Sequence, residues 1–175
     1  MNYAEIKYID VANGPGIRTS LFVSGCNHHC KGCFNEVAWD FNYGKVFDKK
    51  VEDEILESLA PENVDGITLL GGEPLEKVNQ EGLLPLVKRI KETYPKKNIW
   101  LFTGFLFDKD VMGNMLEKWD VSKELIPLID VVVDGKFDEE LKDLNLKFKG
   151  SSNQRTIDVQ ETLKKGCICL LEEYN

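Results

Sequence analysis

Residues 17–33 read IRTSLFVSGCNHHCKGC, an apolar run followed directly by a loop that carries three cysteines. The run predicts a β-strand over Ile17–Val23. In the loop, Cys26, Cys30 and Cys33 follow the spacing C-x3-C-x2-C. Thiolates are soft ligands that suit iron–sulfur clusters and zinc. Three of them can bind three irons of a cubane and leave one iron open, so the loop predicts a metal centre with a free coordination site.

The same residues allow two other interpretations of this loop. The cysteines could line one face of a helix as small core residues, but His28, His29 and Gly32 make a poor helix. Zinc bound by the three cysteines and one histidine is a real competitor, and spacing alone does not exclude it. We interpret His28 and His29 themselves as a solvated pair of loop residues.

The rest of the chain alternates short β-like runs with helical stretches, which predicts parallel strands joined by right-handed helical crossovers. The 175 residues are too few for a complete β/α barrel, which typically takes about 250. We therefore expect an α/β fold, a partial (open) β/α barrel of mostly parallel strands, as a single domain over residues 1–175. Pro85 should lie in the first turn of its helix, where proline is tolerated. Strands are expected at Gly66–Leu70, Ile99–Thr103, Val131–Val133 and Arg155–Val159, and helices at Lys49–Ala60, Glu81–Thr93, Val111–Trp119 and Lys123–Leu128.

Residues suited to chemistry cluster just after the predicted strands. In parallel α/β folds the carboxyl ends of the strands form the active-site face. Together with the cysteine loop, this placement predicts an enzyme. The clusters are Gly71-Gly72-Glu73-Pro74, Thr103-Gly104 and Asp134-Gly135-Lys136.

Composition narrows the setting of the protein. Its 22 Lys and Arg against 30 Asp and Glu give a net charge of −8, and an acidic surface repels phosphate backbones, so we expect no nucleic-acid partner. No apolar run approaches the roughly 20 residues that span a bilayer, and the first residues lack a signal peptide's apolar core. We expect no membrane association and a cytoplasmic location, where thiols stay reduced. Cys167 and Cys169 are interpreted as alternating residues of a C-terminal strand, with a redox or auxiliary-metal role left open.

Four further motifs carry a resemblance that covers residues 13–159. They closely resemble the activating proteins of anaerobic ribonucleoside-triphosphate reductase, which are glycyl-radical-enzyme activases of the radical S-adenosylmethionine (SAM) superfamily. Many superfamily members have an aromatic residue where this chain has Gly32, and glycine there is usual for the reductase activases. Phe34 would supply the adjacent apolar cover instead. The motifs are NGPGIRT at 13–19, GGEP at 71–74, DGKF at 134–137 and GSSNQR at 150–155.

The resemblance implies two cofactors and a set of residues that bind them. Cys26, Cys30 and Cys33 would hold a 4Fe-4S cluster, and SAM would chelate the open iron through its amino and carboxylate groups. The residues implied for SAM are Gly71 and Gly72 through their backbone, Glu73 for the amino group, Thr103 and Gly104 as lining, Asp134 for a ribose hydroxyl and Lys136 for the carboxylate. For Asp134 and Lys136, an exposed turn is an equal alternative.

The resemblance also implies the reaction and the partners. The reduced cluster would cleave SAM to methionine and a 5′-deoxyadenosyl radical, which would take hydrogen from a glycine Cα of the large reductase subunit. The electron would come from a flavodoxin, ferredoxin or thioredoxin-type donor. Gly150–Arg155 could contact the partner's loop or the cofactor's adenosine, or form a polar turn. Arg18 would support the cysteine loop or meet the partner.

Three alternatives compete with this function. The chain could activate another glycyl-radical enzyme such as pyruvate formate-lyase, or act as a small radical enzyme on a small molecule. It could instead be a non-enzymatic module that binds zinc or carries electrons as a ferredoxin does. A carrier normally uses a fourth cysteine, which Cys167 or Cys169 could supply only if the C-terminus folded back onto the loop.

Overall fold

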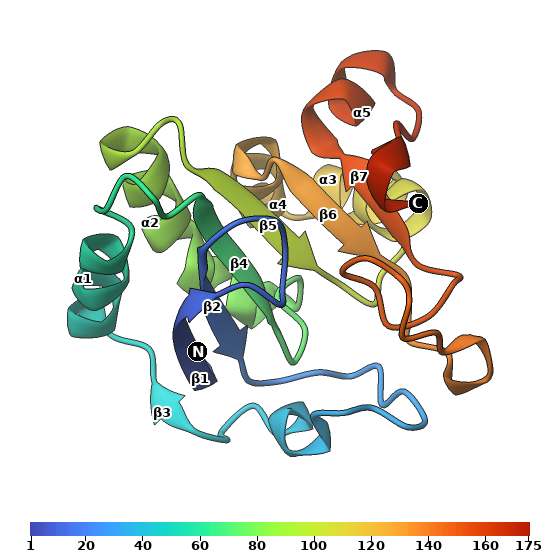
Figure 1. The fold of residues 1–175 in the computed structure, drawn as a ribbon, viewed down its shortest axis with the longest axis horizontal. Coiled ribbons are helices and arrows are strands. Elements are labelled where there is room, and N and C mark those ends of the chain that lie inside the picture. Colours follow the sequence, from blue (N-terminus) through green and yellow to red (C-terminus); the bar gives the residue numbers. More distant parts are fainter.

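A computed structural model describes all residues from 1 to 175 and contains one seven-stranded sheet in the order β3-β1-β2-β4-β5-β6-β7 (Figure 1). The four central strands β2, β4, β5 and β6 run parallel, while β1, β3 and β7 pair antiparallel at the two sides. The expected α/β class is confirmed. The strands are β1 Asn2–Asp10, β2 Arg18–Val23, β3 Lys45–Val46, β4 Gly66–Gly71, β5 Asn98–Phe102, β6 Val131–Asp134 and β7 Arg155–Asp158.

Helices connect the parallel strands, as the alternation predicts. None of them is both long and apolar enough to cross a membrane. The α-helices are α1 Lys49–Ser58, α2 Lys77–Thr93, α3 Leu116–Lys118, α4 Asp120–Leu125 and α5 Val159–Lys165; a π-helix spans Phe107–Met115, and 3-10 helices span Glu36–Trp39, Ile126–Leu128, Glu139–Leu141 and Glu172–Tyr174.

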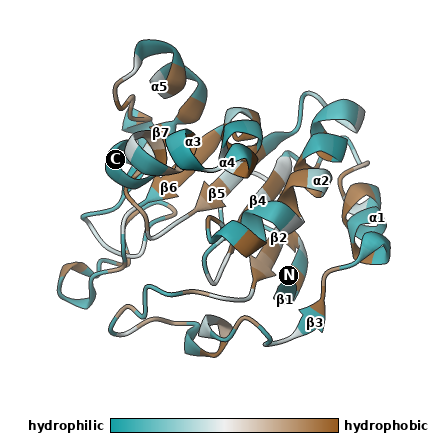
Figure 2. Ribbon diagram, turned by 180° about the vertical axis from the view of Figure 1, so that it is seen from behind, coloured by the Kyte–Doolittle hydropathy of each residue, from teal (hydrophilic) through white to brown (hydrophobic).

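The sheet separates two apolar layers because successive side chains of a strand point to opposite faces. On β5, Ile99 and Leu101 join the main core of 26 buried residues, to which the helices contribute. Trp100 points to the other face, where it forms a smaller cluster with Val131 and Val133. Figure 2 shows the central strands largely hydrophobic and the helices carrying both hydrophilic and hydrophobic surfaces.

The parallel strands direct four loops to one edge of the sheet. The arrowheads of β2, β4, β5 and β6 point the same way in Figure 1, so the loops that follow these strands gather at that edge. The outer strands β3 and β7 do not pair with each other, and the sheet stays open. The edge at the strand ends is therefore where the predicted site residues meet.

Several sequence predictions about elements are wrong in detail. The strand at Arg155 runs antiparallel to β6 rather than parallel. Helix α2 begins at Lys77, so Pro85 lies inside it, and its missing N–H leaves the carbonyl of Glu81 without its helical partner. The segment expected as a helix at 111–119 is helical, but its helix begins earlier, at Phe107, and is a π-helix as far as Met115. Cys167 and Cys169 are not in a strand, since the only pairing nearby is an isolated bridge between Leu170 and Ile157.

Candidate active site

One cavity of about 440 Å³ lies at the carboxyl ends of the central strands. All three cysteines of the loop after β2 line it, although Cys26 and Cys33 are seven residues apart in the sequence. The loops after β4 and β5 provide the adjoining wall. The predicted site residues that the structure brings together here are Cys26, Cys30, Cys33, Gly71, Gly72, Glu73, Thr103 and Gly104.

The cysteine loop begins in a fixed backbone conformation. Gly25 has a φ of +97°, and a Cβ there would lie 2.2 Å from the ring of Phe41, so glycine is required at this position. The Gly25 N–H donates to the carbonyl of Ala38 at 2.7 Å, and the Cys26 N–H donates to the carbonyl of Trp39 at 3.1 Å. These contacts hold Cys26 against the segment that follows the loop.

The three thiols differ in burial. Cys26 is buried, while Cys30 and Cys33 are half-buried. Burial raises the pKa of the Cys26 thiol to about 11 and also raises the pKa of Cys30. Both thiols are therefore protonated near neutral pH, and a metal must displace their protons on binding.

The donor set fits a polynuclear cluster. No three of the His, Cys, Asp and Glu side chains converge closely enough to bind one metal ion. The three thiols instead lie around the wall of one cavity. In a cubane each cysteine binds a different iron, so ligands spread around a cavity of this size are chemically suitable for such a cluster.

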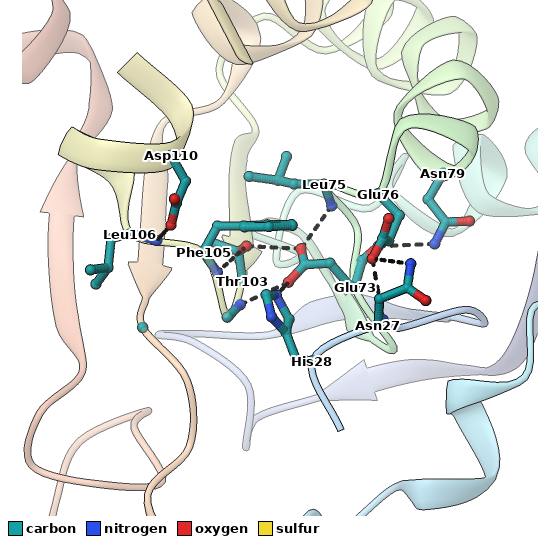
Figure 3. Close-up of polar contacts among 12 residues, drawn as sticks. Asn27, His28, Glu73, Leu75, Glu76, Asn79, Thr103, Phe105, Leu106 and Asp110 are labelled. Atoms are coloured by element: carbon teal, nitrogen blue, oxygen red, sulfur yellow. Dashed lines mark hydrogen bonds and ion pairs between the residues drawn. The ribbon is translucent and has the colours of Figure 1, made fainter. Parts of the chain in front are cut away.

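Glu73 is the polar centre of the neighbouring wall (Figure 3). Its side chain is 1% exposed, and its Oε1 accepts hydrogen bonds from the Leu75 N–H and the Thr103 hydroxyl, both at 2.8 Å. Its Oε2 accepts from the Gly104 N–H and from Nε2 of His28, again at 2.8 Å. A carboxylate offers about four lone-pair sites, and here all are filled. A cofactor's amino group could bond to Glu73 only by displacing one of these donors.

Of the two histidines of the cysteine loop, His28 is packed and His29 is exposed, so the prediction of a solvated pair is wrong for His28 and confirmed for His29. The His28 side chain is 9% exposed and meets the ring of Phe105 edge-on, with centroids 4.4 Å apart. His29 stacks on Trp39 with centroids 4.5 Å apart. The buried His28 ring thus holds the loop together with the backbone contacts, while the His29 ring adds an exposed stacking contact.

Asp134 and Lys136 do not line the cavity, so their expected contacts with SAM are not supported by this geometry. Asp134 ends β6 directly opposite Arg155 of β7 in the antiparallel register. The Arg155 guanidinium donates to both oxygens of the fully buried Asp134 carboxylate, at 2.9 and 2.5 Å, and also to Asp108 at 3.0 Å. These hydrogen bonds raise the pKa of Arg155. Lys136 lines a separate polar hollow beside the cavity.

The polar side chains of Gly150–Arg155 are used within the protein. Gln154 donates through Nε2 to the carbonyl of Gly135, and Asn153 donates through Nδ2 to the carbonyl of Lys136, both at 2.9 Å. The Gly150 N–H donates to Oε1 of Gln154 at 2.8 Å. The segment therefore secures the loop after β6, and only Gly150 and Gln154 of its residues line the cavity.

Arg18 lies at the opposite end of β2 from the cysteine loop, so neither predicted role for it is supported. It is fully buried and donates to the hydroxyl of Thr68 and to the carbonyl of Ile67, both at 2.7 Å. Its guanidinium faces the ring of Trp100 at 5.7 Å. Burial lowers the pKa of Arg18 to about 10. Arg18 thus stabilises the face of the sheet on which Trp100 lies.

Sequence reasoning missed part of the cavity wall. The two most exposed large apolar residues, Leu144 at 89% and Phe34 at 83%, both line the cavity. Phe34 follows Cys33 directly and lines the cavity as expected of an apolar cover beside the cysteines, whereas nothing in the sequence marks Leu144. Besides Leu144, the apolar lining residues missed are Ala12, Trp39, Leu70, Phe102, Phe137, Leu146 and Phe148.

Comparison with known proteins gives consistent matches. Residues 12–157 match the family described as 4Fe-4S single cluster domain. The chain is 44% identical over 156 residues to the anaerobic ribonucleoside-triphosphate reductase-activating protein of Haemophilus influenzae, which covers 88% of this chain and 96% of the relative. The protein of that name from Escherichia coli K12 is 43% identical with the same coverage. The one from Enterobacteria phage T4 is 38% identical, covering 89% of this chain and 92% of the relative.

Proposed function

The chain belongs to the family of anaerobic ribonucleoside-triphosphate reductase-activating proteins, and on that basis we propose that it installs a glycyl radical on such a reductase by reductive cleavage of SAM. The observation that carries this proposal is the joint lining of one cavity by the cysteine loop and the Gly71–Glu73 turn. It joins a site for a reactive cluster to a site for a small cationic cofactor.

Cys26, Cys30 and Cys33 hold the 4Fe-4S cluster in this proposal. The match to a 4Fe-4S single cluster domain supports the cluster and favours it over zinc. Three protein thiolates leave one iron for SAM. When bound, these groups supply one-electron reductive cleavage of a carbon–sulfur bond and, through it, hydrogen abstraction. The protein's own residues bind, orient and enclose them.

The wall that adjoins the cysteine loop provides the SAM site. Gly71 and Gly72 bring backbone groups close to the ligand because no side chain intervenes. Glu73, whose partners all donate to it, places a negative charge beside the cationic groups of SAM. Thr103 fixes the orientation of that carboxylate. Apolar lining such as Leu70 and Phe102 excludes water from the reacting groups.

The open sheet leaves room for the partner. We propose that the fold is the partial β/α barrel of radical SAM enzymes and that a glycine-bearing loop of the reductase's large subunit closes its cavity. The exposure of Phe34 and Leu144 at the cavity supports this, since large apolar side chains in water mark contact sites. An electron donor of the flavodoxin, ferredoxin or thioredoxin type completes the scheme, which we place in the cytoplasm.

Anaerobic reconstitution tests the cofactor part of the proposal. The protein should bind about four irons and four sulfides per chain. With SAM and a strong reductant it should then release 5′-deoxyadenosine and methionine. A zinc-only protein, or a cluster that does not cleave SAM, would contradict the proposal.

A further inference from the structure

The carboxylate of Glu73 joins three loops that leave neighbouring parallel strands. Thr103 and Gly104 donate to it from the loop after β5, and Leu75 donates from its own turn after β4. The fourth donor, His28, comes from the cysteine loop after β2. The His28–Glu73 bond is 2.8 Å long, and both side chains are nearly excluded from solvent, at 9% and 1% exposed. Figure 3 shows the imidazole directed at this junction.

The His28 imidazole packs directly against the backbone of Gly104. A Cβ at Gly104 would lie 2.5 Å from Cδ2 and 2.7 Å from Nε2 of His28, closer than real contacts allow. The backbone of Gly104 is outside the left-handed region. Glycine is therefore required here by the approach of the His28 ring and not by the backbone conformation.

The rest of the cysteine loop has few buried attachments of its own. The Asn27 side chain and N–H both donate to Glu76, but these bonds are exposed to solvent. Lys31 pairs with Glu139 with 87% of its side chain exposed, and exposed ion pairs contribute little to stability. Between Cys26 and Cys30, His28 is thus the buried side-chain attachment of the loop to the strand ends.

We propose that His28 is a positioning residue: packed against Gly104 and hydrogen-bonded to Glu73, it holds the loop that carries Cys26 and Cys30 in place before any metal binds. The role of this fixed loop conformation in cluster assembly rests on the proposed function. The loop conformation itself is a property of the metal-free protein and can be measured there. A pre-formed loop presents the thiols without first losing conformational entropy.

Hydrogen–deuterium exchange of metal-free protein tests the proposal. In His28→Ala the amides of residues 26–33 should exchange about tenfold faster, the factor that corresponds to losing a hydrogen bond worth about 1.4 kcal/mol. In His28→Gln a side-chain N–H can still reach Glu73, so most of the protection should return. Amides of helix α2 should not change in either variant, which shows that the fold is intact.

Gly104→Ala tests the packing of His28 against Gly104 without removing any hydrogen-bonding group. The new methyl group should push the imidazole away and speed loop exchange as His28→Ala does. Because both changes break one contact, the double variant should exchange no faster than either single variant. Gly113→Ala is the matched control, since its methyl group would meet only the Asp108 carbonyl, at 3.4 Å. It should leave the loop unchanged.

Unchanged loop exchange in His28→Ala, or additive effects of His28→Ala and Gly104→Ala, would overturn the proposal. If His28→Ala does not fold, Gly104→Ala and His28→Gln still decide it. After reconstitution, the electron paramagnetic resonance signal of the reduced cluster with SAM should be broadened in His28→Ala and restored in His28→Gln. A loop that loosens as expected in a protein that never cleaves SAM would leave the positioning role intact and refute the proposed function.

Discussion

At the cavity wall, one carboxylate accepts hydrogen bonds from four residues and is almost inaccessible to water. Removing it leaves buried donors unpaired, and each unpaired buried donor typically costs about 1–3 kcal/mol. We therefore expect Glu73→Ala to lower the free energy of unfolding of the metal-free protein by about 3 kcal/mol or more. Urea denaturation measures this. A loss below about 1 kcal/mol would mean that Glu73 is not the junction described above.

The five cysteines should separate cleanly in metal content. Cys26→Ala, Cys30→Ala and Cys33→Ala should each abolish a stable 4Fe-4S cluster because one iron then lacks its protein ligand. Cys167→Ala and Cys169→Ala should keep nearly full iron content, since neither residue lines the cavity. Iron and sulfide analysis after anaerobic reconstitution gives the result. Loss of iron in the C-terminal pair, with retention in any of the first three, would reverse the assignment of ligands.

Among the elements, the pairing of β6 with β7 depends on a buried ion pair. Arg155→Ala leaves the fully buried Asp134 with only the Phe107 N–H as donor. Breaking a buried pair from one side costs about 3–5 kcal/mol, and the partial exposure of Arg155 favours the lower value.

The matched control for this variant is Arg89→Ala. Arg89 also bonds two carboxylates and has a similar exposure, 31% against 29% for Arg155, and each arginine has one exposed partner, but the more buried partner of Arg89, Glu52, is 12% exposed against 0% for Asp134. Its loss should cost about 1 kcal/mol or less. Denaturation of both variants compares the two pairs. Equal losses would show that the burial of Asp134 adds nothing.

The central strands were predictable because each is a short apolar run that ends at polar or glycine residues. β1 was not predicted, although Asn2–Asp10 partly alternates charged and apolar residues as a half-exposed strand does. Its place in the sheet comes from pairing with both β2 and β3. The antiparallel direction of β7 has no signal in the sequence of the strand, since direction depends on the connection and not on the strand's own residues. Pro85 misled the boundary of α2 because tertiary packing outweighs one missing hydrogen bond.

Over the whole molecule, the parts of the site that follow strands were predictable and the parts set by pairing were not. Cys26, Gly72 and Thr103 meet because the carboxyl ends of parallel strands lie side by side. Asp134 also lies at the carboxyl end of a parallel strand, but its carboxylate is bound by Arg155, whose position depends on an antiparallel register. The contact of His28 with Glu73 joins residues 45 apart and has no local sequence signal.

The exposed apolar residues at the cavity give a prediction about the assembled complex. Phe34→Ser and Leu144→Ser should each weaken binding to the reductase about tenfold, because truncating a central apolar contact commonly costs more than about 1 kcal/mol. Val46→Ser is the control, since Val46 is also highly exposed, at 69%, but does not line the cavity. Anaerobic binding measurements compare the three. Equal affinities throughout would place the reductase on another surface.

Formation of the glycyl radical tests the central claim most directly. The reconstituted protein should be mixed without oxygen with its reductase, SAM and a strong reductant, and examined by electron paramagnetic resonance. We predict a stable glycyl radical on the large reductase subunit, seen as a doublet from the remaining Cα hydrogen, together with deoxyribonucleotide formation. The Cys26→Ala protein should give neither. Normal cleavage of SAM with no glycyl radical on that subunit would contradict the account and point to a different target for the activated cofactor.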